Sequence, residues 1–333
     1  MASARYRFAP GLELALEGPA AALRHFAREY GPAAVAPAAE PPALRATIAW
    51  GGDAADDGHK TVRWGVRLGA PDGEPLVLEL ALRGRPRRFA LSLVQGFLLE
   101  PVLSVAAARA GHVLLPAAGL GEDGAAVVVL GRSRSGKSSA MTLALAAGRH
   151  VLGDDQVLLD AAGGCLPFPR RLRLYPDLRQ TAPAAFRRLP AADRGALLAR
   201  SAARTLSRGW LAPSLAVRPS AVGPRAPDGP LPVRRLVAVE RAGDLDGPVA
   251  GPLEADVAIA LALDVLDEQR ARLRDAAGPA WRAALDELRD READLLRGAL
   301  DGVGLERLRM PAAWPAPRGV AHLAGALGLQ GAS

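Results

Sequence analysis

The chain is poor in lysine, aromatic residues and cysteine. Its 333 residues include 42 Lys plus Arg, but only Lys60 and Lys137 are lysines, and aromatic residues make up 4%. The single cysteine, Cys165, cannot form an internal disulfide, which favours a reducing compartment. The sequence has no apolar run of 18 residues and no signal-peptide core, so we expect neither a membrane-spanning helix nor export. These absences predict a cytoplasmic protein without a membrane partner.

The net charge of +7 comes almost entirely from arginine. Such a balance is compatible with a nucleic-acid partner or with an acidic or phosphorylated one. However, the sequence has no zinc-ligand pattern and no helix-turn-helix signature, and few aromatic residues are available to stack on bases. The arginines are spread along the chain. We therefore interpret most of them as a solvated surface and do not expect nucleic acid as a partner.

One stretch has the pattern of a phosphate-binding loop. Residues 127–130, Val-Val-Val-Leu, predict a buried strand, and residues 139–147 predict a helix that ends near Gly148. Gly-x-x-x-x-Gly-Lys-Ser lies between them, and its glycines allow a turn that points several backbone N–H groups at one anion. The helix adds unpaired N–H groups and the positive end of its dipole. The residues expected to contact a nucleotide are Gly131, Arg132, Ser133, Arg134, Ser135, Gly136, Lys137, Ser138 and Ser139.

Two side chains of this loop have specific expected roles. Lys137 would reach the β- and γ-phosphates, and the hydroxyl of Ser138 would ligate Mg²⁺. A compact ammonium suits a phosphate, and the chain places one of its two lysines here. The alternative is a Gly/Ser-rich turn without a ligand, which the flanking strand and helix make less favourable.

Two consecutive carboxylates follow the next predicted strand. Asp154 and Asp155 come directly after residues 149–153, Arg-His-Val-Leu-Gly. The strand next to the loop strand in an α/β sheet ends at the same edge as the phosphates, and consecutive strand residues point to opposite sides. One carboxylate could therefore face a substrate hydroxyl while the other faces Mg²⁺. The alternatives are a carboxylate pair of Walker B type in a plain ATPase and a simple turn at the end of a strand.

The segment after the carboxylates, residues 165–174, is extended and basic. Its prolines argue against a central strand. Its arginines, Arg170, Arg171 and Arg173, would clamp phosphates or an acidic peptide, or would lie at a solvated edge.

The chain is expected to form three regions. Residues 1–95 are expected to be β-rich, with a helix at 19–30 and strands at 44–50, 60–68, 76–82 and 88–93. Residues 96–250 are expected to form the nucleotide-binding core, in which a helix at 95–110 and a hairpin with its turn at 119–124 precede the loop. Residues 251–333 are expected to be helical, with helices at 255–274 and 279–300.

The residues around the loop resemble those of a known family. Gly131-x-Ser-x-x-Gly-Lys-Ser138, followed by Gly148-Arg-His-Val-Leu-Gly-Asp-Asp-Gln-Val-Leu158, is similar to the C-terminal catalytic domain of HPr kinase/phosphorylase. It looks closer still to smaller HPr-kinase-related proteins, some of which accompany peptide-modification genes, including lasso-peptide kinases. The resemblance covers about residues 100–175 and includes His112 in a strand before the loop.

The resemblance implies an α/β fold: a P-loop nucleotide-binding core of the HPr kinase C-terminal type, with a β-rich N-terminal region and a helical C-terminal region. It implies a kinase that uses ATP and Mg²⁺ to phosphorylate a serine hydroxyl of a peptide or small protein. Asp154 would be the general base, and Asp155 would support the metal beside Ser138. His112 would contact phosphate or shuttle a proton, and the alternative is a partly buried strand histidine.

Departures from the family pattern limit what it implies. Arg134 replaces the family's middle loop glycine, and Ser139 stands where HPr kinases usually carry an acidic residue. The later glycine-rich signature, linked to the phosphorylase reaction and to hexamer contacts, is not found. Its absence argues against dephosphorylation, a hexamer and HPr itself as the substrate, while a homo-oligomer of another kind is left open. The alternative functions are a kinase for a small-molecule hydroxyl and a non-catalytic nucleotide-binding regulatory module.

Overall fold

The chain folds into two compact units. The structure is a computed structural model that describes residues 2–51, 57–208 and 214–329. The first unit contains residues 1–115 and 263–298, and the second contains residues 116–262 and 299–333. Both units mix helices with β-sheet. This division differs from the three expected regions, because the helix after residue 95 and much of the C-terminal helical sequence belong with the N-terminal sheet.

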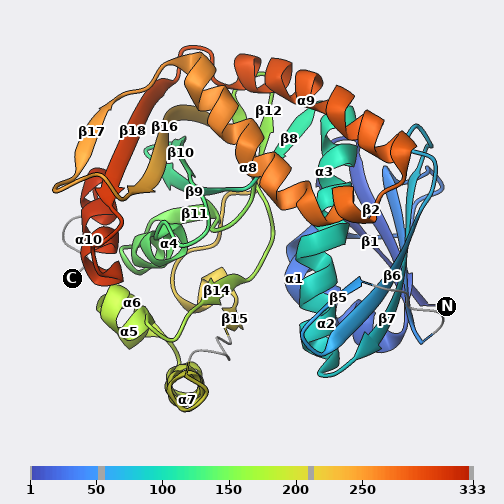
Figure 1. Cartoon of the computed structure of the whole chain (residues 1–333), viewed down its shortest axis with the longest axis horizontal. Coiled ribbons are helices and arrows are strands. Elements are labelled where there is room, and N and C mark those ends of the chain that lie inside the picture. The colour runs from blue at the N-terminus through green and yellow to red at the C-terminus, as the bar shows by residue number, and fades with distance from the viewer. Residues whose placement is uncertain (1, 52–56, 209–213, 330–333) are drawn as a thin grey trace. The chain divides into compact units, whose positions relative to one another are not determined.

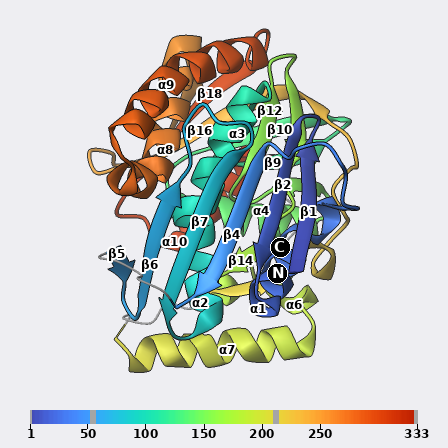
Figure 2. The same cartoon turned by 90° about the vertical axis from the view of Figure 1, so that its right-hand side faces the viewer.

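A seven-stranded sheet forms the first unit, in the order β3-β1-β2-β4-β7-β6-β5 (Figure 2). Its strands are β1 (Ala2–Ala9), β2 (Leu12–Gly18), β3 (Ala34–Val35), β4 (Leu44–Trp50), β5 (Asp57–His59), β6 (Val62–Leu68) and β7 (Leu76–Gly84). β2, β4 and β7 run parallel, and the other pairs are antiparallel. Buried and more exposed residues alternate along β2 and β7, so one face of the sheet packs on a core and the other is more open.

Helices cover one face of this sheet (Figure 1). They are α1 (Ala20–Tyr30), α2 (Arg87–Val94) and α3 (Glu100–Arg109), and a π-helical turn (Gln95–Leu99) joins the last two. The expected strand at 88–93 was wrong. Leu91, Val94 and Leu98 are buried at helical spacing, and this longer pattern outweighs the short alternation that suggested a strand.

Among the described residues, one helical stretch, residues 87–109, is long and apolar enough to cross a membrane by length and composition alone. However, 72% of its most apolar window is buried inside the structure. A core helix has this property, because it is apolar on every side that packs.

The C-terminal helices are α8 (Ala255–Ala276) and α9 (Pro279–Ala299). α8 begins in the second unit and ends in the first. Within the first unit, the guanidinium of Arg270 on α8 donates to both carboxylate oxygens of Glu292 on α9, and its Nε donates to Oγ of Ser104 on α3 at 2.9 Å. All three side chains are buried, so this network joins three helices across the core of the unit.

Parallel strands form the centre of the second unit. β10 (Ala125–Leu130) pairs in parallel with β16 (Leu231–Ala242), and β16 pairs in parallel with β18 (Gly304–Pro311). The flanking strands pair antiparallel with their neighbours: β9 (Ala117–Glu122) with β10, β11 (His150–Gly153) with β9, β17 (Val249–Pro252) with β18, β13 (Gly164–Pro167) with the start of β16, and β12 (Val157–Asp160) with β13. Every residue of β10 is buried, as expected for a central strand.

Two local expectations are corrected in this unit. The turn between β9 and β10 is shorter than the expected 119–124 and consists of Asp123 and Gly124. Their φ angles of 48° and 76° are the left-handed conformation that a two-residue hairpin turn of this kind needs. The C-terminal region is not only helical, since it supplies β18 and the last two residues of β17 to the sheet. In β18, Leu308 and Met310 are buried on either side of Arg309, a two-residue period too short to stand out in the sequence.

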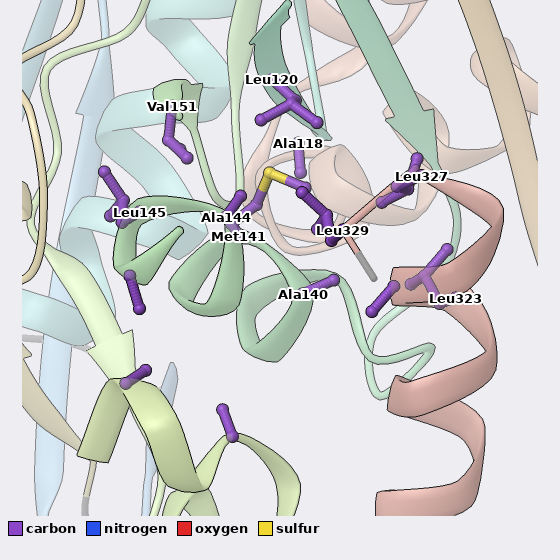
Figure 3. Close-up of a cluster of buried hydrophobic side chains, with 14 of the residues drawn as sticks. Ala118, Leu120, Ala140, Met141, Ala144, Leu145, Val151, Leu323, Leu327 and Leu329 are labelled. Carbon is purple, nitrogen blue, oxygen red and sulfur yellow. The ribbon is translucent and has the colours of Figure 1, made fainter. Parts of the chain in front are cut away.

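Helix α4 (Lys137–Ala146) lies at the centre of the hydrophobic core of this unit (Figure 3). The side chain of Met141 points from α4 toward Leu120 of β9, and Leu323 approaches α4 from α10 (Ala316–Ala326). Two short helices, α5 (Leu178–Thr181) and α6 (Pro183–Arg188), belong to the same packed group. This packing fixes the start of α4, which is where the predicted phosphate loop ends.

Candidate functional site

A loop of residues 131–136 joins the buried end of β10 to α4. Arg134 and Gly136 have positive φ angles of 69° and 102°. Gly131 is confined in another way, because a Cβ there would lie 2.6 Å from the carbonyl oxygen of Val239 on β16. The strand, the tight loop and the helix therefore occur in the order that the sequence pattern predicts, with α4 starting at Lys137.

The side chain of Lys137 folds back over this loop. Its Nζ donates hydrogen bonds to the carbonyl oxygens of Gly131 and Arg132, the second at 3.0 Å, and lies 3.5 Å from Oγ of Ser135. Lys137 is only 8% exposed. The loop thus holds an ammonium against neutral carbonyl groups, and a phosphate would be a stronger acceptor for the same charge.

The start of α4 also fits an anion. The N-cap residue of this helix is Gly136, which has no side chain to cap the first-turn amides, and such a terminus suits an anion. The other predicted loop residues differ in exposure. Ser135 is buried, Gly131, Gly136, Ser138 and Ser139 are half-buried, and Arg132, Ser133 and Arg134 are exposed. The hydroxyl of Ser139 donates to Oγ1 of Thr181 on α5 at 3.4 Å, which links the helix start to α5.

Asp154 and Asp155 follow β11, which is not the direct neighbour of the loop strand as expected. β9 lies between them, and because β10 and β11 are both antiparallel to β9, they run parallel to each other. Two strand spacings place β11 about 10 Å from β10. Val128 and Gly153 both pair with Gly119, so the carboxylates and the loop lie at the same edge of the sheet.

Asp154 is a buried carboxyl with an unusual pKa. Its side chain is 3% exposed, and its Oδ2 accepts a hydrogen bond from the amide of Arg173 at 3.3 Å. Its pKa is raised from 3.8 to about 6. Burial is the larger cause and the charge of Asp155 the smaller one, while Arg170 and the Arg173 amide oppose the shift. A carboxyl of this kind changes charge close to neutral pH.

Asp155 has the opposite environment. It is exposed and forms an ion pair with Arg170, whose Nη1 lies 3.1 Å from its Oδ2. The Arg170 side chain is only 11% exposed, so this arginine belongs to the site and not to a solvated edge. Arg171 donates instead to the carbonyl oxygen of Ala216 at 3.4 Å.

His112 lies in β8 (His112–Leu115), which belongs to the first unit. The ring is largely buried, and its Nε2 lies 3.3 Å from the carbonyl oxygen of Pro10 in the same unit. The loop and the carboxylates lie in the second unit. The observed partner of His112 is therefore a structural one, and its role toward phosphate stays a prediction.

Among the residues that the structure describes, no group of three or more His, Cys, Asp or Glu side chains is arranged to hold a metal ion. This composition still suits Mg²⁺ bound with a nucleotide, because that ion keeps several waters and takes only one or two protein ligands beside the phosphates. Ser138 and Asp155 are of the right chemical type for it.

Three features of the site could not be identified from motif matching. The hydrogen bond to Asp154 comes from a main-chain amide, which any residue at position 173 would supply. Tyr175 stands near both carboxylates, whose charges raise the pKa of its phenol in addition to the larger effect of burial. Gly153 is required by a tight turn, because a Cβ there would lie 1.9 Å from the carbonyl oxygen of Gln156. The glycine before the two aspartates was the one visible signal of this turn.

Comparisons with known proteins do not identify the chain. No model of a known protein family matches it, and no curated protein sequence matches it.

Proposed function

We propose that the chain is an ATP-dependent kinase that transfers the γ-phosphoryl group to a serine hydroxyl of a peptide or small protein. In this proposal the second unit is a P-loop core of the HPr-kinase type. The observation that carries the proposal is the buried carboxyl of Asp154, with a pKa of about 6, at the sheet edge where the Lys137 loop also ends. A loop that only binds nucleotide needs no such group, whereas proton transfer from a hydroxyl does.

The loop would hold the triphosphate of ATP. Lys137 would exchange its carbonyl acceptors for phosphate oxygens, and the amides at the start of α4 would bind the same group. Mg²⁺, when bound, would neutralise charge on the β- and γ-phosphates. Ser138, and Asp155 once its pair with Arg170 opens, are the residues that would hold it.

Asp154 would accept the proton of the serine hydroxyl. Its Oδ2 is held by the Arg173 amide, so Oδ1 is the oxygen for the hydroxyl. In the reaction the serine oxygen bonds to the γ-phosphorus, the bond from that phosphorus to the β–γ bridging oxygen breaks, and the proton moves to Asp154. A carboxyl with a pKa of about 6 is mostly ionised at pH 7 and is a stronger base than an ordinary aspartate.

Transfer of label from γ-labelled ATP tests this proposal. The full-length protein is incubated with Mg²⁺ and a panel of peptides that are centred on serine or end in serine. We expect wild type to phosphorylate at least one peptide, with a rate that rises through about pH 6 as Asp154 ionises. Asp154→Asn should lower the rate about 10²–10⁴-fold, the usual contribution of a general base.

Two controls separate the outcomes. Peptides with alanine in place of serine should take no label, and Asp154→Asn should bind Mg·ATP as well as wild type. ATP binding without transfer to any peptide would contradict the peptide kinase and favour a small-molecule kinase or a regulatory nucleotide module. Transfer that survives in Asp154→Asn would remove this residue from the mechanism.

A further inference from the structure

Helix α7 (Ala191–Leu206) of the second unit turns an apolar face to the solvent. Leu197 is its one buried residue, whereas Leu198 is 48% exposed and Leu206 is 85% exposed. Figure 2 shows the helix side-on. A contiguous apolar face that is exposed to solvent is a typical feature of a surface that packs against a partner.

Eight of the nine exposed residues of α7 recur at helical spacing and lie on one face, and the ninth, Arg204, lies on the opposite side. That face consists of Ala191, Ala192, Gly195, Leu198, Ala199, Ala202, Thr205 and Leu206. All but Thr205 are apolar or glycine, and the small residues between the two leucines would let another helix approach closely. The shape therefore suits a helix with an apolar seam.

The surroundings of this face are basic. Residues 178–208 contain one acidic residue, Asp193, and seven arginines: Arg179, Arg187, Arg188, Arg194, Arg200, Arg204 and Arg208. In the described part of the chain none of the seven forms an ion pair. Arg194 and Arg200 donate only to carbonyl oxygens of the same segment, at 2.9 Å to Arg187 and 3.0 Å to Ala196. A partner that carries carboxylates beside its apolar seam would match this charge.

α7 is also connected to the candidate site. It contacts β15 (Leu215–Val217), and β15 pairs with β14 (Leu172–Leu174). The amide of Arg173 in β14 binds the Asp154 carboxylate. Two strands, β15 and β14, therefore link α7 to the proposed base.

We propose that α7 docks an amphipathic helix with acidic flanks that belongs to the phosphoryl acceptor. This inference rests on the proposed kinase function and names the part of the substrate that the enzyme recognises away from the serine. A second copy of the chain fits less well, because pairing two α7 faces would bring both sets of arginines together. A membrane surface fits less well, because the face has no tryptophan or phenylalanine to anchor it.

Fluorescence anisotropy with designed peptides tests the docking site without any transfer reaction. The probe is a fluorescein-labelled helix about three heptads long, with leucine at the a and d positions and glutamate at the others. A matched peptide carries lysine in place of glutamate. We expect the full-length protein to bind the acidic probe with an affinity that falls as salt is added, and not to bind the lysine peptide.

Two variants locate the binding on α7. Leu198→Gln/Leu206→Gln removes the apolar contacts. Arg188→Glu/Arg194→Glu reverses the charge of two arginines of the same segment, of which Arg194 lies at the edge of the apolar face. Each should weaken binding of the acidic probe at least about 10-fold, the effect of losing a well-packed contact region. Arg24→Glu/Arg234→Glu changes two exposed arginines elsewhere by the same charge and should leave binding unchanged.

Three results would overturn the docking site: no binding of the acidic probe to wild type, equal binding by all variants, or equal binding of the lysine peptide. Sedimentation and vesicle binding test the other occupants. A dimer that the leucine variant dissociates, or binding of anionic vesicles that competes with the probe, would replace the peptide by a second copy or a membrane. Mg·ATP binding is measured on the same samples, so a failure of the kinase proposal is seen separately.

Discussion

Asp154→Asn should make the protein more stable at pH 8 while it slows phosphoryl transfer. The pKa of Asp154 is about 6 in the folded protein and has its ordinary value of 3.8 in the unfolded chain. Folding therefore favours the protonated carboxyl. Its contribution is fully present below pH 4 and is lost as the pH rises through 6, because a buried carboxylate must then be kept charged.

Asparagine avoids this cost and can still accept the Arg173 hydrogen bond through its side-chain oxygen. A shift from 3.8 to about 6 corresponds to about 3 kcal/mol at most. We expect the melting temperature of Asp154→Asn to exceed that of wild type by roughly 3–8 °C at pH 8 and to equal it below pH 4. Differential scanning calorimetry across this range measures the effect.

Asp155→Asn is the matched control. It removes a charge that raises the pKa of Asp154, so the pH dependence of stability should move to lower pH and keep its shape. A destabilised Asp154→Asn at pH 8, or a difference from wild type that does not vary with pH, would show that this carboxyl is not held against its charge. Asp154 would then be no stronger a base than an ordinary aspartate.

Arg270→Met should be among the most destabilising single substitutions in the first unit. It leaves the carboxylate of Glu292, which is 1% exposed, without its bidentate partner in the core. Breaking a buried pair in this way costs about 3–5 kcal/mol, whereas replacing both partners by apolar residues is often neutral. We therefore expect Arg270→Met/Glu292→Leu to recover most of the stability that Arg270→Met loses.

An exposed pair on the same two helices provides the comparison. Arg274 and Asp286 are 2.7 Å apart, with side chains that are 38% and 67% exposed, and Arg274→Met should change the free energy of unfolding by less than about 1 kcal/mol. Urea unfolding of all variants measures these differences. An Arg270→Met variant as stable as Arg274→Met would show that the buried network does not hold the C-terminal helices on α3.

The parts of the fold that could be predicted are those with a strong local pattern. The apolar run at the end of β10, the glycines of the loop and the helix after Lys137 follow one another in the sequence and in space. The helices α1, α8 and α9 were predicted almost to their ends because their apolar periods are long. Short patterns are less informative: residues 88–93 alternate as in a strand but form part of α2, and β18 has no pattern long enough to predict it.

What could not be predicted depends on contacts between distant parts of the chain. The two units are discontinuous in sequence, since residues 263–298 return to the N-terminal sheet. The strand β9, inserted between β10 and β11, follows from pairing and not from composition. Segment 170–173 contacts the two aspartates differently: the Arg173 amide bonds to the buried Asp154, and the Arg170 side chain pairs with the exposed Asp155. Two identical side chains cannot reveal this difference in the sequence.

The central claim is that the loop of residues 131–139 binds the phosphates of ATP. It can be tested directly by labelling lysines, because the sequence contains only two. An ATP analogue acylated on its terminal phosphate transfers the acyl group to an amine held against that phosphate. Lys137 lies in the loop, and Lys60, an exposed residue of the first unit, is the internal reference. Mass spectrometry should find Lys137 acylated and protected by excess Mg·ATP, with Lys60 unprotected. Equal labelling of both lysines, unaffected by ATP, would contradict the account.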